Sequence, residues 1–142
     1  MPDARHVYLL TDPAQKARLR KLLMERGLAS YMNDTKWREL CWGIGELAFA
    51  PAYQIKCVDR DTPEPSELAY APAYLGDWAR TPEACLGIHV EWLKIAPRYA
   101  RHGGARATPA IEDCTSALLA LLDRLKIVYD EQDGFITLYG HR

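Results

Sequence analysis

Three stretches of the chain repeat hydrophobic residues at the spacing of an amphipathic helix. The first runs from about Pro13 to Arg26, and Gly27 is placed to end it. The second follows Asn33-Asp34-Thr35, three residues that can each cap a helix. The third begins at Thr108-Pro109, where a capping side chain precedes a proline. Its core-facing positions are Ile111, Cys114, Leu118, Leu121, Leu122 and Leu125.

Other stretches have the composition or the alternation of strands. A short strand is predicted over His6–Leu10, and Tyr53, Ile55 and Cys57 alternate with more polar neighbours. Residues 86–95 predict a central strand, with Leu86, Ile88, Val90 and Trp92 on one face. Residues 127–129 and 135–139 flank a loop containing Gly134, the pattern of a β-hairpin that ends the chain as a sheet edge.

Helices and hairpin strands in this order favour an α+β fold, with an antiparallel sheet of about five or six strands packed against three helices. A length of 142 residues is typical of one domain. We therefore expect a single domain over residues 1–142, in which residues 1–30 form a strand-helix extension and residues 31–142 form the core.

Composition excludes several classes of protein. Hydrophobic residues make up 49% of the chain and charged residues 26%, values too balanced for a disordered tail. The net charge of −1 offers no global field for collecting nucleic acid, so a nucleic-acid partner is not expected. Neither a membrane span nor a secretory segment is visible. Widely spaced cysteines read as reduced thiols and predict a cytoplasmic protein, with one disulfide pair as the minor alternative; they are Cys41, Cys57, Cys85 and Cys114.

The most distinctive segment lies between residues 59 and 82, where proline, acidic residues and aromatic rings are concentrated. Long loops in small domains are usually functional or mobile, and Tyr and Trp often anchor interfaces. The alternative is that the rings fold back and cap the core. The predicted partner-binding residues are Asp59, Asp61, Glu64, Glu67, Tyr70, Tyr74, Asp77 and Trp78.

A second unusual segment, residues 96–107, is predicted to be a loop rich in arginine and glycine. Guanidinium groups and glycine amides can hold an anion, although the spacing fits neither a P-loop nor a dinucleotide fingerprint. The candidate anion-binding residues are Arg98, Arg101, His102 and Arg106.

No assembled catalytic or metal-binding motif appears in the sequence. Cys85, His89 and His102 lack the paired spacing of zinc ligands, so neither a metal nor a cofactor is expected. Glu91 beside Trp92 is a candidate for a buried carboxylate with a raised pKa. Nucleophilic catalysis needs Cys, Ser or Thr poised by His and a third group, and separated residues do not reveal that geometry. Catalysis is therefore not predicted.

Several stretches together resemble a bacterial family of small uncharacterised domains. The most specific is Asn33-Asp34-Thr35-Lys36-Trp37, and weaker matches follow at residues 51–56, 91–95 and 134–140. The resemblance spans most of residues 28–140, and it implies a compact cytosolic domain without transferring a catalytic residue. In general appearance the chain is also similar to immunity proteins of bacterial toxin systems.

The leading functional hypothesis is a partner-binding protein, specifically an immunity protein that neutralises a cognate toxin by binding it. The acidic, tyrosine-rich segment would supply anchors and steer association with a basic cleft. The alternative is a small enzyme or anionic-ligand-binding domain that uses residues 98–106. A homo-oligomer assembled through an edge strand at residues 135–139 is a third hypothesis.

Overall fold

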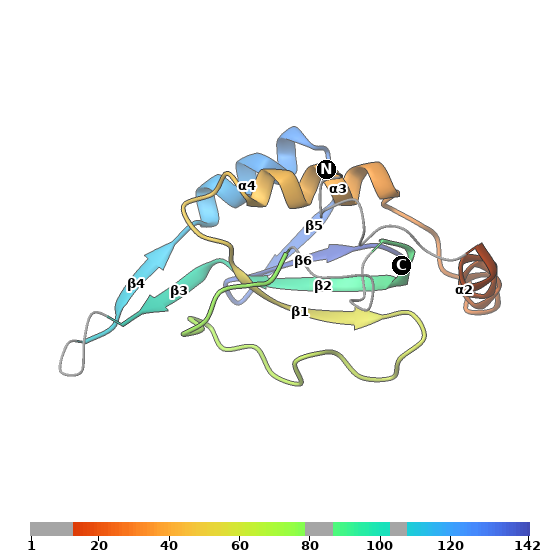
Figure 1. Cartoon of the computed structure of the whole chain (residues 1–142), viewed down its shortest axis with the longest axis horizontal. Coiled ribbons are helices and arrows are strands. Elements are labelled where there is room, and N and C mark those ends of the chain that lie inside the picture. Colours follow the sequence, from red (N-terminus) through yellow and green to blue (C-terminus); the bar gives the residue numbers. More distant parts are fainter. Residues whose placement is uncertain (1–12, 79–86, 103–107) are drawn as a thin grey trace.

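The computed structural model describes residues 13–78, 87–102 and 108–142 (Figure 1). This part of the chain contains three α-helices, a short 3-10 helix and six strands. The helices are α2 (Pro13–Glu25), α3 (Asp34–Ile44) and α4 (Thr115–Arg124), and the 3-10 helix is η1 (Gly87–His89). The strands are β1 (Ala52–Cys57), β2 (Val90–Ala96), β3 (Arg98–Arg101), β4 (Ala110–Asp113), β5 (Tyr129–Gln132) and β6 (Phe135–Tyr139).

The strands form two antiparallel sheets. Four of them make one sheet in the order β1-β2-β6-β5, while β3 and β4 make a separate ribbon. The α+β class and the antiparallel pairing are confirmed. The division into two sheets was not predicted. It occurs at Pro97, which interrupts the run between β2 and β3 because it cannot donate a ladder hydrogen bond.

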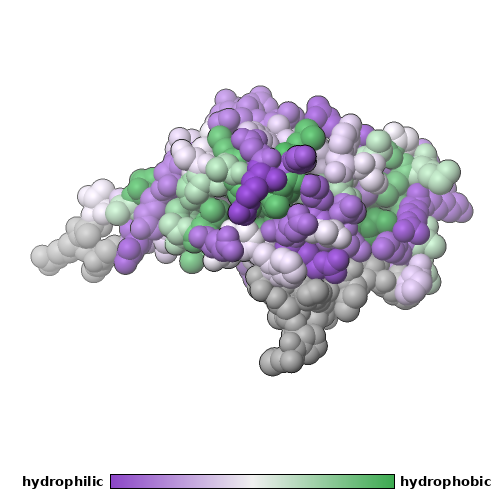
Figure 2. Space-filling model, turned by 90° about the horizontal axis from the view of Figure 1, so that it is seen from above, coloured by the Kyte–Doolittle hydropathy of each residue, from purple (hydrophilic) through white to green (hydrophobic). Residues whose placement is uncertain are grey.

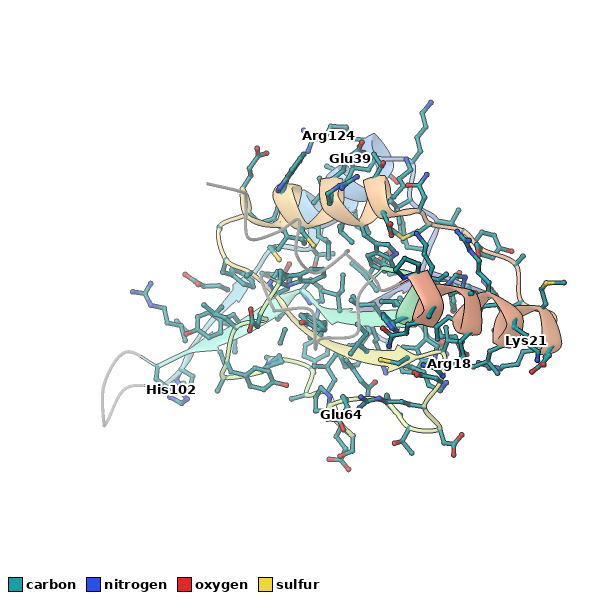
Figure 3. The ribbon with its side chains drawn as sticks, turned by 45° about the vertical axis from the view of Figure 1, so that its right-hand side comes forward. Arg18, Lys21, Glu39, Glu64, His102 and Arg124 are labelled. Atoms are coloured by element: carbon teal, nitrogen blue, oxygen red, sulfur yellow. The ribbon has the colours of Figure 1, made fainter. Side chains whose placement is uncertain are left out.

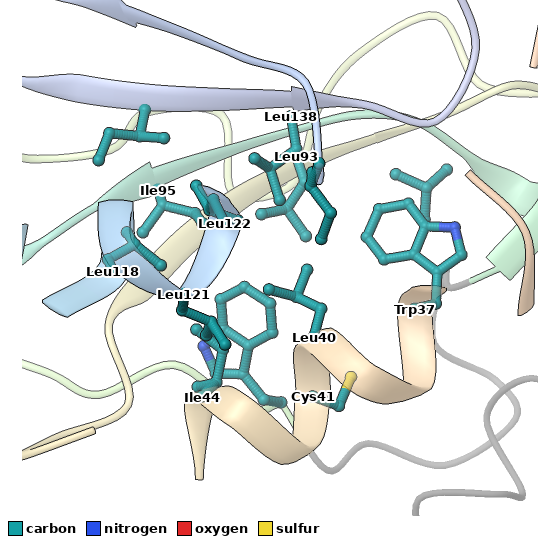
Figure 4. Close-up of a cluster of buried hydrophobic side chains, with 14 of the residues drawn as sticks. Trp37, Leu40, Cys41, Ile44, Leu93, Ile95, Leu118, Leu121, Leu122 and Leu138 are labelled. Carbon is teal, nitrogen blue, oxygen red and sulfur yellow. The ribbon is translucent and has the colours of Figure 1, made fainter. Parts of the chain in front are cut away.

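Helices α3 and α4 cover one face of the four-stranded sheet (Figure 1). Their apolar stripes meet the sheet residues that point toward them and enclose a buried core (Figure 4). The two helices approach closely at Gly43, where an added Cβ would lie only 2.3 Å from Leu121 Cδ1. The largest buried side chains include Trp37, Leu40, Ile44, Leu93, Ile95, Leu118, Leu122, Ile136 and Leu138.

Helix α2 lies at one end of the sheet (Figure 1) and matches the predicted helix over residues 13–26. Leu19 and Leu23 are its buried residues. Gly27, at φ +67°, adopts the left-handed conformation that ends a helix. The chain then pairs with its own C-terminal residues, since Ser30 and His141 form an antiparallel bridge.

The predicted start of the third helix is wrong. Thr108 and Pro109 precede strand β4, and α4 begins only at Thr115. Residues 110–113 pair with β3 instead, and the Asp113 carboxylate accepts a hydrogen bond from the Thr115 backbone N–H at 2.7 Å. Glu112 and Asp113 therefore lie on a strand, and Ile111 is exposed rather than core-facing.

The predicted facing of the central strand also needs correction. Residues 87–89 form η1 rather than strand. Within β2 the register shifts, because Lys56 pairs with Trp92 while Cys57 pairs with Val90. The extra residue, Glu91, is a bulge that lets Val90 and Leu93 both be buried while Trp92 faces outward.

Strand β6 is not an edge. It pairs with β2 on one side and β5 on the other, so residues 135–139 have no free edge for the strand addition on which the homo-oligomer hypothesis rested. The hairpin turn is tighter than predicted, because Asp133 and Gly134 both have positive φ and suffice to join β5 to β6. The exposed edge is instead the short strand β5.

The cysteines depart in part from the prediction. Cys41 and Cys114 are buried thiols, but Cys57 is disulfide-bonded. The inference that every cysteine is reduced is therefore wrong at Cys57. Cys85 and the predicted strand at His6–Leu10 lie outside the described residues. Among those that are described, no helix is long and apolar enough to cross a membrane.

Candidate partner-binding surface

Residues 59–78, hereafter the acidic segment, contain neither a helix nor a named strand, yet they are held at several points. Its first part runs along β1 on the side away from α3 and α4, and its end turns back toward the core (Figure 1). Ile55 and Glu64 exchange both backbone hydrogen bonds at 2.8 Å. The Gln54 side chain donates to the carbonyls of Pro65 and Ser66. These contacts secure the first half of the segment to β1.

Further backbone contacts secure the second half. The Ala100 N–H donates to the Pro72 carbonyl at 2.8 Å, and the Gly76 N–H donates to the Ala50 carbonyl at 3.0 Å. An alanine Cβ at Gly76 would lie 2.1 Å from the Pro51 carbonyl oxygen, so the two backbones are in close contact. The segment is therefore shaped by its partners rather than by secondary structure of its own.

Trp78 is the buried anchor of the acidic segment. Its side chain is only 6% exposed and belongs to the main hydrophobic cluster. The indole N–H donates to the Pro51 carbonyl at 2.8 Å, and its ring packs edge-on against Tyr53 with centroids 4.8 Å apart. Trp78 thus caps the core, as the alternative interpretation held, and is not available to a partner in this structure.

Arg98 is the second anchor. Its guanidinium donates to the carbonyls of Tyr70 and Gly134, at 2.9 and 2.7 Å. It also lies 3.6 Å from the centroid of the Tyr70 ring, and that ring meets Phe135 edge-on. Arg98 is buried. Its hydrogen bonds connect β3 to the acidic segment and to the β5–β6 turn.

Most of the remaining side chains of the acidic segment are exposed. Tyr70 is 58% exposed, Tyr74 is 49% exposed, and Leu75 beside it is equally open. Asp61, Glu64 and Glu67 are exposed and make no ion pair with any described residue. Glu64 projects away from the body of the protein (Figure 3). Asp59 differs, since it pairs with Arg18 at 3.3 Å.

A hollow of about 600 Å³ lies between the acidic segment and the outer edge of β1. Tyr53, Tyr74 and Leu75 give it apolar walls, and Glu64 and Asp77 also line it. We call it the loop hollow. The Tyr53 hydroxyl donates to the Asp77 carbonyl at 2.6 Å, which holds one wall in place. Three of the predicted binding residues, Glu64, Tyr74 and Asp77, thus meet around one cavity.

A second hollow, of about 410 Å³, lies on the sheet face opposite α3 and α4. We call it the sheet groove. Trp92 and Lys94 of β2 line it together with residues of the β5–β6 hairpin. The Lys94 ammonium sits 4.4 Å from the centre of the Phe135 ring. Because Phe135 also touches Tyr70, the sheet groove borders the acidic segment.

The predicted anion-binding residues are not assembled into a site among the described residues. Arg98 donates hydrogen bonds to two carbonyl groups. Arg101 is exposed, and its guanidinium lies 3.7 Å from the Glu112 carboxylate. His102 is at the end of the β3–β4 ribbon (Figure 3), and Arg106 lies outside the described residues. Of the three described residues, Arg98 is thus buried, while Arg101 and His102 are exposed.

Glu91 does not have the raised pKa that its sequence context suggested. Burial raises the pKa of this carboxylate. Hydrogen bonds from Arg26 at 2.7 Å and Lys56 at 2.9 Å, together with the charges of these two residues, lower the pKa by more than burial raises it. The net pKa lies below the ordinary value of 4.5. Glu91 is thus held ionised between two cations and is unsuited to general acid catalysis.

No group of three or more His, Cys, Asp or Glu residues in the described parts of the chain could hold a metal ion. Of the three candidate metal ligands, His102 follows strand β3 of the ribbon, whereas His89 lies in η1, next to β2 of the separate four-stranded sheet. Cys85 lies outside the described residues. The expectation of no cofactor remains a prediction.

The sequence did not reveal one further polar cluster. Ser30 and His141, 111 positions apart, are hydrogen-bonded at 2.8 Å beside a cavity of about 380 Å³ between α2 and the start of α3. Only the pairing of residues 29–31 with the C-terminal residues brings them together. No local spacing signals such a contact.

The motif Asn33-Asp34-Thr35-Lys36-Trp37 has a structural explanation. Asn33 caps α3, its side-chain oxygen accepting from the Lys36 N–H at 2.9 Å. The Lys36 ammonium donates to the Leu125 carbonyl just after α4, and Trp37 is fully buried in the core. The motif thus starts α3 and fastens it to α4 and the sheet.

Fold and surface together define a small α+β domain whose acidic segment is ordered without secondary structure of its own. The chain belongs to a family of unknown function (DUF6678), which matches residues 19–142. The match starts inside α2. Comparisons with curated proteins and with solved structures give no match.

Proposed function

We propose that this protein is a binding module whose acidic segment docks a basic surface of a protein partner. The observation that carries the proposal is that this segment is held in one shape. Trp78 and Arg98 attach it to the interior of the fold. The side chains of Tyr70, Tyr74 and Leu75 remain exposed to solvent. A surface already held in one shape loses less conformational entropy when it binds. Exposed rings on such a support are suitable interface anchors.

Charge indicates the kind of partner. Residues 59–78 contain five carboxylates, Asp59, Asp61, Glu64, Glu67 and Asp77, and one basic residue, Arg60. Like charges gathered on one loop favour approach by a positive surface and accelerate association at low salt. The loop hollow adds a receptacle, because its aromatic walls and acidic lining suit the stem and head of a lysine or arginine side chain.

In its most specific form, the proposal is an immunity protein that covers the basic cleft of a cognate toxin. Two features support it: the acidic segment offers charge of the sign needed to occupy such a cleft, and its exposed rings are placed beside that charge. Binding alone would be sufficient for this role, so no catalytic group is required.

The test compares two variants of the full chain. Tyr74→Ala combined with Glu64→Lys removes one wall of the loop hollow and reverses a charge beside it. Tyr31→Ala removes a tyrosine of similar exposure from outside the segment. Each protein is immobilised and used to capture partners from a lysate of the organism that makes it. The affinity of the captured partner for each protein is then measured at two salt concentrations.

We expect the wild type and Tyr31→Ala to bind the same partner, more weakly at high salt, and the double variant to lose at least about 2 kcal/mol of binding free energy. A partner that binds the double variant equally well would refute this placement of the interface. For the immunity role, the wild type but not the double variant should restore growth of cells that express the captured partner. Failure of the wild type to protect would leave a binding module that is not an immunity protein.

A further inference from the structure

We infer that Ser30 and His141 form a nucleophile–base pair that transfers acyl groups from esters bearing a negative charge. The pair lies at the cavity between α2 and α3, hereafter the α2–α3 cleft, which is separate from the residues of the proposed partner surface. The inference does not depend on the proposed binding function.

Backbone pairing explains why the two side chains meet. The Tyr31 N–H donates to the Gly140 carbonyl, and the Arg142 N–H donates to the Ala29 carbonyl, both at 2.8 Å. Ser30 and His141 are therefore directly opposite in a position without hydrogen bonds between their own backbones. Side chains at such positions lie on the same face and close together. The strand pairing thus holds nucleophile and base in register.

The hydrogen bonds of His141 assign the direction of proton transfer. Its Nε2 lies 2.9 Å from the Ile88 carbonyl oxygen, which can only accept, so Nε2 carries the hydrogen of the neutral ring. Nδ1 therefore has the lone pair, and the Ser30 hydroxyl donates to it at 2.8 Å. A serine hydroxyl, a histidine base and a group that orients the base are the three parts that nucleophilic catalysis requires.

Burial keeps the base in its active form. His141 is almost fully buried, and loss of water lowers its pKa more than the Ile88 hydrogen bond and the Glu91 charge raise it. The net pKa is below 6.5, so the ring is neutral at physiological pH. Ser30, in contrast, is exposed, and an incoming carbonyl group can reach its Oγ.

The cleft walls indicate the class of substrate. Leu23, Met32 and Ile88 provide apolar surface, and α2 contributes Lys16 and Arg20. Lys16 forms an ion pair with Asp34 at 3.5 Å, whereas Arg20 makes no ion pair with a described residue. Arg20 therefore offers a positive charge to a carboxylate or phosphate on the substrate. An ester with a short apolar chain and an anionic end fits this lining.

The reaction balances without another reactant than water. Ser30 Oγ bonds to the ester carbonyl carbon as its proton moves to His141 Nδ1. The carbon–oxygen bond to the alcohol then breaks, and the departing oxygen takes that proton. Water next gives a proton to Nδ1 and bonds to the acyl carbon, after which the acid leaves and Ser30 recovers its proton.

The test uses the full chain and a fluorescent fluorophosphonate, which loses fluoride as an activated serine oxygen bonds to its phosphorus. We expect labelling at Ser30, mapped by mass spectrometry, and a loss of at least about 100-fold in labelling rate in Ser30→Ala. Ser116→Ala, which removes an exposed hydroxyl from α4, should label normally. Equal labelling of wild type and Ser30→Ala, or no labelling of either, would overturn the inference.

Two further readouts test the roles of His141 and Arg20. His141 is near Glu91, Lys16, Arg20 and Asp34, and its protonation should stop labelling, with a midpoint below pH 6.5. With nitrophenyl esters, Arg20→Ala should lower kcat/KM roughly ten-fold for the succinate half-ester but leave the neutral acetate unchanged. A pH-independent labelling rate, or equal losses for both esters, would contradict these assignments. His141→Gln, if folded by its melting curve, should label as poorly as Ser30→Ala.

Discussion

The acidic segment and the β3–β4 ribbon are opposites in the way they are held. The acidic segment has no regular structure, yet side chains and backbone groups on β1, β3 and the preceding turn bind it along its length. The ribbon has regular strands and is attached at its base, where Arg98 and Ala100 contact the acidic segment. Its far end extends from the body of the molecule (Figure 1), and half of its strand residues are exposed. Regular hydrogen bonding within an element and attachment to the rest of the fold are therefore separate properties.

The two sides of the molecule differ in the same way. The side formed by α3 and α4 is largely hydrophilic, with smaller apolar areas (Figure 2), because these helices have turned their apolar stripes to the sheet. On the opposite side the sheet groove leaves aromatic walls accessible, and the loop hollow opens at the outer edge of β1, where Tyr53 and Tyr74 line it. A binding role is more readily supported by these two hollows, where apolar surface is exposed on ordered elements.

The largest effect on this contrast should come from Trp78→Ala. Removing a buried indole leaves a cavity and an unsatisfied Pro51 carbonyl, and we expect a loss of about 3 to 5 kcal/mol in the free energy of unfolding. Ile111→Ala in the ribbon, which removes an exposed side chain, should change it by less than about 0.5 kcal/mol. Urea denaturation measures both. Similar losses in the two variants would show that the acidic segment is no better attached than the ribbon.

Arg98→Met should have the next largest effect. The substitution keeps an apolar stem but leaves the Tyr70 and Gly134 carbonyls without their donor, so we expect a loss of about 2 to 3 kcal/mol. Arg101→Met on the same strand is the matched control, since its long contact with Glu112 is exposed and should contribute about 0.5 kcal/mol or less. Limited proteolysis should cut the acidic segment faster only in Arg98→Met. Equal stability of the two variants would refute the role of Arg98 as an anchor.

These two arginines show which part of the structure the sequence could predict. Apolar spacing was sufficient for α2, α3 and β1, because Leu19, Trp37 and Ile55 each lie on a regular stripe. It failed for the start of α4, where Asp113 ends a strand and accepts from Thr115 rather than joining the helix. Arg98 and Arg101 look alike in sequence, and only the fold places one in the interior and the other in solvent.

The candidate sites were harder to predict for the same reason. Tyr70, Tyr74 and Trp78 form one aromatic group in the sequence, but burial divides them into two exposed rings and one anchor. Ser30 and His141 meet through a strand pairing that joins distant parts of the chain. Long-range contacts of this kind leave no periodic signal, so composition could locate the acidic segment but not the loop hollow or the α2–α3 cleft.

Glu91→Gln should have a smaller and pH-dependent effect. The pKa of Glu91 is lowered in the folded protein, so its ionised form adds stability above the unfolded pKa near 4.5, and this contribution disappears as the pH falls through the folded pKa. We expect Glu91→Gln to lose about 1 kcal/mol at pH 7, with the difference from wild type shrinking below pH 4.5. Glu131→Gln, which alters an exposed carboxylate on β5, is the control. A constant difference across pH would refute the ion-pair explanation.

Tyr74→Ala should have the smallest effect on stability and the clearest effect on function. Its side chain is half exposed and no hydrogen bond to its hydroxyl is recorded among the described residues, so the free energy of unfolding should change by less than about 0.5 kcal/mol. Because Trp78 and Arg98 hold the acidic segment from beneath, the segment should keep its shape when Tyr74 is removed. Thermal denaturation and amide hydrogen exchange at residues 59–78 measure these two properties. Rapid exchange there would show that Tyr74 itself maintains the segment, and a loss of partner binding in Tyr74→Ala would then reflect disorder rather than a missing anchor.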